Sequence, residues 1–258
     1  MVREVPQEDF FSKALKYSKW SNKLFWISFV ISIILQLTNQ YTKNISYIDT
    51  IKTPISVFLL IIIFVLDIIT NYYTDNGESI RRTSFIDNSF GTKYCTQESK
   101  NYYDNDELGH GLYKLLINLY ENTFYTKKNL EIMLEKITTK TISYLLILIL
   151  LAIIGFSNCA IAVSILQIFL SKKVLIKEIS THNYYNNVKK VYDEMTGVFN
   201  LKITDENAGK FQAKIIELLI RYEASISSNR VQLSEKAFND NNEKWLEEWK
   251  VIKNRYGI

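Results

Sequence analysis

The sequence predicts an all-α membrane protein with four transmembrane helices and a cytosolic helical layer. Charged residues disappear from long apolar stretches, and the remaining polar segments repeat apolar residues at helical spacing. No segment shows sustained strand alternation. The mean hydropathy of −0.05 hides this segregation because it averages the two kinds of segment. Hydrophobic residues make up 47% of the chain and aromatic residues 14%, which excludes wholesale disorder.

The first two predicted spans are residues 24–40 and 54–70. A helix of about 17 residues covers roughly 25 Å, which is enough to cross the hydrocarbon core of a bilayer with some local thinning. Residues 1–23 are polar and amphipathic, and no small-residue cleavage pattern follows the first apolar stretch. We therefore expect them to form a cytosolic N-terminal helix that stays attached.

The third apolar region, residues 141–171, contains no charged residue. As one straight helix it is roughly 45 Å long, which exceeds the thickness of the hydrocarbon core. A turn at residues 155–158, which include Gly155 and Asn158, divides it into two short spans. We therefore expect the third and fourth spans to form a hairpin.

The orientation follows from the lysines and arginines that flank these spans. Basic residues gather before the first and third spans and after the fourth, namely Arg3, Lys13, Lys16, Lys19, Lys23, Lys127, Lys128, Lys136, Lys140, Lys172, Lys173 and Lys177. The other connections carry little positive charge. By the positive-inside rule, both termini and the segments 71–140 and 172–258 are cytosolic, in a multi-pass membrane protein.

The polar segments are predicted to be helical. Residues 107–136 show apolar side chains at helical spacing, with Asp104 or Asp106 as the N-cap, and this helix continues into the third span. The C-terminal region predicts three further helices, over residues 185–199, 205–227 and 232–254.

The composition favours a non-enzymatic protein. Two cysteines and two histidines lie far apart, so no metal-ligand spacing exists and no zinc site is expected. No glycine-rich phosphate loop or nucleophile elbow is present either. We predict no catalytic residue and no cofactor.

Polar residues within the spans form two stripes. Ser28, Ser32 and Gln36 share one face of the first span, and Ser164 and Gln167 share one face of the fourth. Such stripes are predicted to line a water-filled path made by several copies of the chain. The alternative is that the serines bond to their own helix and that the small residues allow close helix packing.

The most specific pattern lies between the second and third spans. It consists of GESIRRTSFIDNSFG at residues 77–91, YYDN at 102–105 and ENTFYTK at 121–127, with Gly111, Lys114, Leu115 and Asn118. With its flanking spans, this pattern resembles the bacterial four-transmembrane effectors associated with SMODS-type nucleotidyltransferases. The resemblance covers residues 10–180 and leaves out the C-terminal helices.

The resemblance implies a role in anti-phage defence, in which a nucleotide made by a partner nucleotidyltransferase controls an effector that breaches the membrane. It also implies that the protein lies in the bacterial inner (plasma) membrane. In Hailong-type systems the effector resembles a tetrameric channel that an oligonucleotide holds closed. In CBASS-type systems a cyclic oligonucleotide opens or activates the effector.

Candidate ligand-binding residues lie in the same pattern. The guanidinium groups of Arg81 and Arg82, beside Asp87, suit phosphate oxygens, and the rings of Tyr102 and Tyr103 suit base stacking. Alternatively, Arg81 or Arg82 pairs with Asp87 and fixes a loop.

The functional hypothesis is a homo-oligomeric ion channel or pore, a tetramer by resemblance, whose opening depolarises the membrane and arrests growth. A single chain with short spans cannot easily enclose an aqueous lumen, whereas symmetry supplies the missing walls. The expected partners are further copies of the chain, the lipid bilayer, and an oligonucleotide or cyclic nucleotide. The alternative function is a membrane-tethered scaffold whose cytosolic helices recruit a partner protein.

Overall fold

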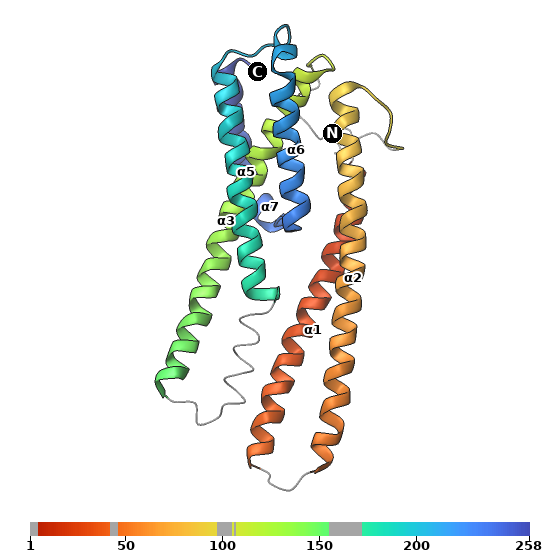
Figure 1. Ribbon diagram of the computed structural model, residues 1–258, viewed down its shortest axis with the longest axis vertical. Helices are drawn as coiled ribbons and strands as arrows, with labels where there is room; N and C mark the ends of the chain where they lie inside the picture. Colours follow the sequence, from red (N-terminus) through yellow and green to blue (C-terminus); the bar gives the residue numbers. More distant parts are fainter. Residues whose placement is uncertain (1–4, 42–45, 97–104, 106, 155–171) are drawn as a thin grey trace. The chain divides into compact units, whose positions relative to one another are not determined.

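The computed structural model describes residues 5–41, 46–96, 105, 107–154 and 172–258, and every regular element in these ranges is helical (Figure 1). The six α-helices are α1 (Glu8–Tyr41), α2 (Ser46–Phe90), α3 (Leu112–Ile154), α5 (Lys177–Asn200), α6 (Gln212–Asn229) and α7 (Glu235–Tyr256). A π-helical turn, Lys172–Ile176, precedes α5, and a 3₁₀ turn, Ala208–Phe211, precedes α6. The predicted all-α class is confirmed for the described part of the chain.

The chain divides into two compact units. The apolar unit contains Gln7–Ile80 and Thr141–Ile176, and the polar unit contains Arg81–Lys140 and Lys177–Ile258. Helices α2 and α3 each contribute residues to both units.

One helix within the described ranges, α2, is long and apolar enough from Pro54 onward to cross a membrane. Only 6% of its most apolar window is buried within the chain, so large side chains such as Phe58 and Phe64 are exposed. This exposure suits contact with lipid. The predicted first and third spans lie within α1 and α3 and remain predictions, while the fourth span and its turn lie outside the described residues.

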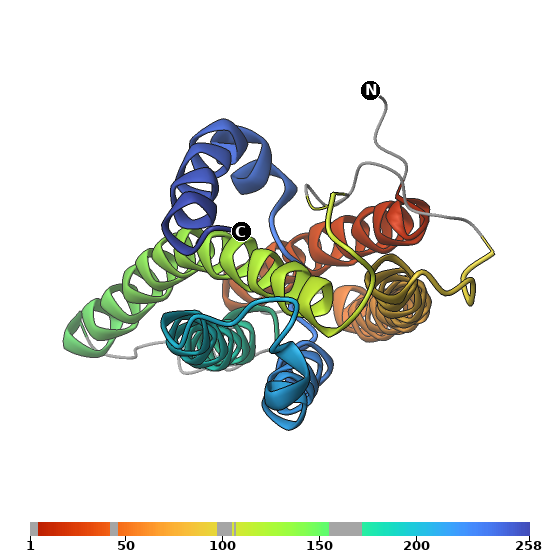
Figure 2. The same ribbon diagram turned by 90° about the horizontal axis from the view of Figure 1, so that it is seen from above.

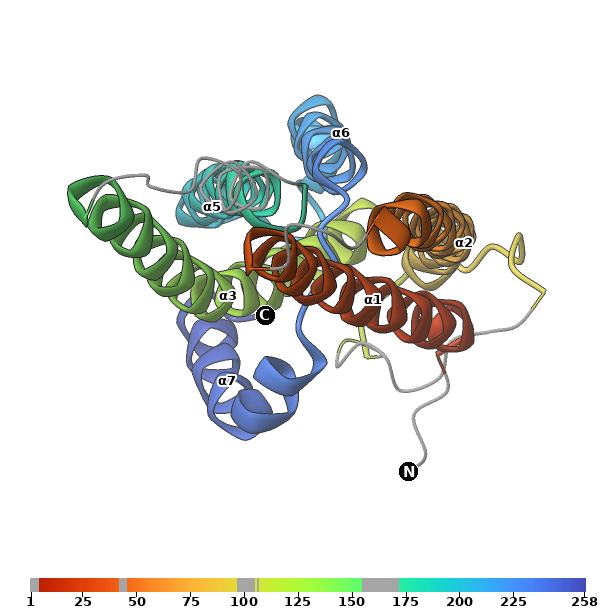
Figure 3. The same cartoon turned by 90° about the horizontal axis from the view of Figure 1, so that it is seen from below.

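In the apolar unit, α1 and α2 lie side by side and antiparallel (Figures 1 and 3). Ser21 of α1 is fully buried and donates a 2.6 Å hydrogen bond from Oγ to Asp67 Oδ1 of α2. The rings of Tyr17 and Tyr73 stack at 5.7 Å. The predicted N-terminal helix is therefore the first part of α1, whose inner face packs on α2.

The polar unit is built around α3, with α5 and α6 on one side and α7 on the other (Figures 2 and 3). Tyr120 lies at its centre, stacked on Tyr192 at 5.0 Å and on Phe199 at 4.9 Å, with Trp249 edge-on at 5.5 Å. The Tyr120 hydroxyl and Thr196 Oγ1 are 2.8 Å apart and share a hydrogen bond. Burial of each large side chain stabilises the fold by about 1.5–3 kcal/mol.

Two glycines set the junction between α2 and α3. Gly91 has φ +69° and ends α2, donating from N–H to Asp87 O at 2.8 Å, and a Cβ there would lie 2.9 Å from the His110 ring. Gly111 has φ +150°, which only glycine adopts readily, and its N–H donates to Ser89 O at 2.9 Å.

The predicted start of the helix at residue 107, capped by Asp104 or Asp106, is therefore wrong. The helix begins at Leu112, because the extended backbone of Gly111 does not continue a helix toward its N-terminal side. The carbonyl of Gly111 accepts the first helical bond, from Leu115 N at 3.0 Å. The predicted continuation of this helix into the third apolar stretch is confirmed, since α3 runs unbroken to Ile154.

The three C-terminal helices are confirmed with shifted ends. Helix α6 begins at Gln212 rather than at residue 205, because Lys202 has φ +55° and Asn207 Oδ1 accepts from Thr204 N at 2.9 Å, which together form a loop. Helix α7 begins after Ser234, whose Oγ accepts from Ala237 N at 3.1 Å as an N-cap.

Candidate functional site

Arg81 lies on α2 and pairs with Glu223 of α6, with Nη2 and Oε2 2.6 Å apart. The two side chains are only 12% and 18% exposed. The guanidinium of Arg81 is therefore largely enclosed against α6, where it holds the end of α2 in the polar unit. Arg82, the next residue, is exposed.

Asp87 lies in the last turn of α2 and organises the segment that follows. Its carboxylate accepts hydrogen bonds from Thr92 Oγ1 at 2.6 Å, from Tyr94 N at 2.9 Å and from Cys95 N at 2.6 Å. Arg81 thus pairs with Glu223, and Asp87 fixes a loop through neutral donors. Arg81, Arg82 and Asp87 themselves all lie on a helix.

The remaining candidate residues divide between described and undescribed parts of the chain. Ser28 Oγ donates to Phe25 O at 2.8 Å, the self-bonding that belongs to the packing alternative, and Ser32 is half-buried on the same helix. Tyr102, Tyr103, Ser164 and Gln167 lie outside the described residues, as does the side chain of Gln36.

A buried polar network joins the ends of α2, α3 and α7. Asn118 of α3 is fully buried and donates to Asn88 Oδ1 at 2.8 Å and to Ser89 Oγ at 3.3 Å. Asn105, also fully buried, donates to Asn118 Oδ1 at 2.9 Å and to Glu121 Oε2 at 2.8 Å. Buried groups satisfied in this way fix a single arrangement of their helices.

This network was missed as a site by sequence reasoning, although its members belong to the pattern at residues 77–127. The available signal was a pair of polar residues, Asn118 and Glu121, at helical spacing between the apolar residues of α3. Lys253 of α7 joins the network by donating to Asn105 Oδ1 at 3.2 Å. That contact links residues far apart in the sequence, so no local pattern indicated it.

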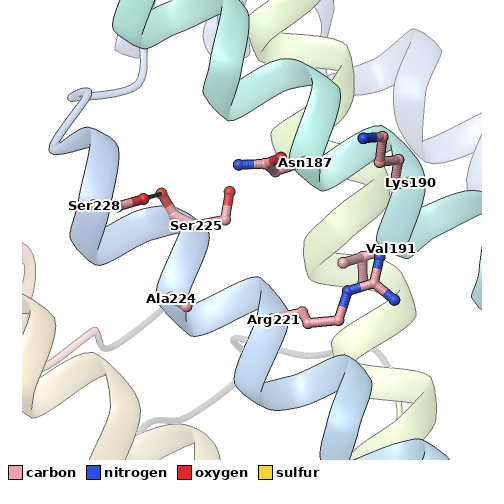
Figure 4. Close-up of a pocket in the computed structure, with 7 residues that line it drawn as sticks. All are labelled: Asn187, Lys190, Val191, Arg221, Ala224, Ser225 and Ser228. Carbon is pink, nitrogen blue, oxygen red and sulfur yellow. Dashed lines mark hydrogen bonds between the residues drawn. The ribbon is translucent and has the colours of Figure 1, made fainter.

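A groove of about 300 Å³ lies between α5 and α6 (Figure 4). Its polar lining comes from Asn187 and Lys190 of α5 and from Arg221, Ser225 and Ser228 of α6. These positions recur at three- and four-residue spacing, so each set lies on one face of its helix.

An ion cluster lies at one end of this groove. Glu194 of α5 pairs with Lys214 at 2.6 Å and with Arg221 at 2.7 Å, and Glu217 contacts the same two cations at 2.7 and 3.1 Å. The hydrogen bond from Lys214 lowers the pKa of the Glu194 carboxyl; partial burial opposes this, and Arg221 adds to it. The cluster holds α5 and α6 together with no net charge.

No protein-family model, curated protein or solved structure matches this chain. No group of metal-ligating side chains occurs among the residues that the structure describes. The candidate sites are therefore the Arg81–Glu223 contact, the buried network and the α5–α6 groove.

Proposed function

We propose that this protein is an anti-phage effector that forms a homo-oligomeric ion channel in the bacterial inner membrane. A nucleotide made by a partner nucleotidyltransferase gates the channel, either holding it closed or opening it. The assembly is a tetramer of multi-pass chains with cytosolic termini, and its opening depolarises the membrane and arrests growth.

The observation that carries this proposal is the dual character of α2. The same helix contains the membrane-length apolar segment from Pro54 and, farther along, Arg81 in its 2.6 Å contact with Glu223. A ligand that binds α6 differently in two states of the protein shifts the equilibrium between them. The Arg81–Glu223 contact is the route by which that shift reaches the helix that contains the apolar segment.

The resemblance of residues 77–127 to the SMODS-associated effectors supplies the class of signal. Most of the pattern that carries this resemblance falls on the last turns of α2 and the first turns of α3, which Asn88, Ser89 and Asn118 join by hydrogen bonds. A residue pattern that spans two helices joined by buried hydrogen bonds suits a protein that transmits a change from one helix to the other.

The proposal is tested by expression in bacteria with and without the partner nucleotidyltransferase, while a voltage-sensitive dye reports membrane potential. A channel held closed by the nucleotide depolarises cells only when the nucleotide is absent, and a channel opened by it depolarises only when it is present. Arg81→Ala should weaken either response, whereas the exposed Lys93→Ala serves as the matched control.

Growth arrest without depolarisation would contradict the channel. A membrane-tethered scaffold, the alternative function, has no means of conducting ions. It would show a normal membrane potential in both strains and would co-purify with its partner protein after crosslinking.

A further inference from the structure

The groove between α5 and α6 contains a buried hydroxyl group without a partner. Ser225 is 2% exposed, and its Oγ makes no hydrogen bond within the described part of the chain. Serine and threonine elsewhere in this protein donate to the carbonyl four residues earlier, as Ser89 of α2 does to Phe85 O at 2.8 Å. A buried hydroxyl left unpaired destabilises the fold, and a ligand that accepts its hydrogen bond removes that cost.

Other donors face the same space. In Figure 4 the side chains of Ser225 and Asn187 point into the gap between the helices, with Ser228 toward one end and Lys190 and Arg221 toward the other. Lys190 is exposed, and it takes part in no ion pair within the described part of the chain. The groove thus combines one cation that lies outside the ion cluster with hydroxyl and amide donors.

Arg221 adds a second cation whose charge is shared. Its Nη1 contacts Glu194 at 2.7 Å and Glu217 at 3.1 Å, and its side chain is 36% exposed. Because Lys214 also pairs with both carboxylates, Arg221 can turn toward an anion in the groove while Glu194 and Glu217 keep a cationic partner.

We propose that the α5–α6 groove binds a phosphate group of a nucleotide through Lys190, Arg221 and the Ser225 hydroxyl. Hydroxyl, amide and cationic donors around one space match the acceptor oxygens of a phosphate. A volume of about 300 Å³ is at the lower end for small-ligand sites and fits one phosphate with its attached nucleoside. The identity of the ligand as a nucleotide rests on the proposed function, whereas the phosphate site rests on these side chains.

The groove lies next to the residue of α6 that pairs with Arg81. Glu223, the partner of Arg81, lies two residues before Ser225 on α6. A phosphate that draws α5 and α6 together therefore acts on α6, the helix whose Glu223 pairs with Arg81 of α2.

The test is isothermal titration of the full-length protein in phosphatidylcholine nanodiscs with AMP, inorganic phosphate and adenosine. AMP and inorganic phosphate should bind, and adenosine should not. Ser225→Ala and Lys190→Ala should each weaken AMP binding about tenfold or more. The matched controls are Ser227→Ala and Lys189→Ala, neighbours that do not line the groove, and they should bind AMP as the wild type does.

Folding is checked on the same samples. Ser225→Ala removes an unpaired buried hydroxyl, so its melting temperature without ligand should equal or exceed that of the wild type. Weaker AMP binding at an unchanged melting temperature then comes from the lost donor. No AMP binding by the wild type, or equal losses in Lys189→Ala and Lys190→Ala, would overturn the site.

Two further measurements separate a nucleotide from a lipid headgroup as the ligand, and the groove site from the channel function. Nanodiscs with phosphatidylglycerol distinguish the phosphate source, since competition that weakens AMP binding there would overturn the nucleotide assignment in favour of lipid headgroups. Nucleotide-dependent ion flux that persists in Ser225→Ala and Lys190→Ala would overturn the site and leave the proposed function standing. AMP binding that these variants weaken, in a protein without flux, supports the site and overturns the proposed function.

Discussion

Replacing Arg81 tests whether α2 is held to α6 by its ion pair with Glu223. The two side chains are 12% and 18% exposed and their charged atoms are 2.6 Å apart, so the pair lies between a surface and a buried salt bridge. Surface pairs contribute about 0–1 kcal/mol, whereas removing one partner of a buried pair costs about 3–5 kcal/mol. We expect Arg81→Ala to lower the free energy of unfolding by about 2–3 kcal/mol.

The assay is thermal unfolding of the full-length protein in detergent, followed by circular dichroism. For a chain of this size, 1 kcal/mol corresponds to about 2–4 °C, so the melting temperature should fall by roughly 4–12 °C. A double-mutant cycle with Glu223→Gln isolates the pair from the other contacts of Arg81. The coupling energy should exceed about 1 kcal/mol.

Additive effects of the two substitutions, within about 0.5 kcal/mol, would refute this reasoning. Arg81 would then act through other contacts, and the proposed route from α6 to α2 would lose its basis. The matched control is Lys93→Ala, an exposed basic residue just beyond α2, which should leave the melting temperature unchanged within about 1 °C.

Three further outcomes follow from the same structure. Trp249→Ala should cost about 3–5 kcal/mol in unfolding experiments, because Trp249 is fully buried against Tyr120 and its loss leaves a cavity; a cost below about 1 kcal/mol would contradict this packing. Glu194→Gln should lower stability by less than about 1 kcal/mol at pH 7, since the pair is partly exposed. Because Lys214 lowers the pKa of Glu194 below its ordinary 4.5, this contribution is present above pH 4.5 and is lost as the pH falls through the lowered pKa; a difference that persists at pH 2 would be inconsistent with it. A cysteine at the exposed position Asn239, in a cysteine-free background, should resist a membrane-impermeant reagent in intact cells, and its labelling would contradict a cytosolic C-terminus.

The helices were predictable because their signals are local. Apolar spacing located the C-terminal ends of α5, α6 and α7 within two residues, whereas the predicted starts of α5 and α6 were seven or eight residues from the observed ones. Backbone conformation decided the helix starts that sequence reasoning misplaced, such as the φ of +150° at Gly111. Gly77 lies within α2, which continues past it to Phe90, and the Phe11 ring is 3.0 Å from the position of a Cβ at Gly77, so the absence of a side chain there lets the ring approach the helix.

The site was less predictable because its contacts join distant residues. Arg81 was identified as a functional residue, but its partner Glu223 is 142 positions away, so the neighbouring Asp87 was the natural alternative. The unpaired hydroxyl of Ser225 depends on how α5 packs against α6. Neither the Arg81–Glu223 pair nor the unpaired Ser225 hydroxyl has a local signature in the sequence.

The most direct test of the central claim is ion flux through the purified protein in sealed liposomes, with and without the nucleotide made by the partner enzyme. A gated channel should change flux about tenfold or more when the nucleotide is added, and Arg81→Ala should reduce that change. Flux that is absent under every condition, or that is the same with and without the nucleotide, would contradict the account.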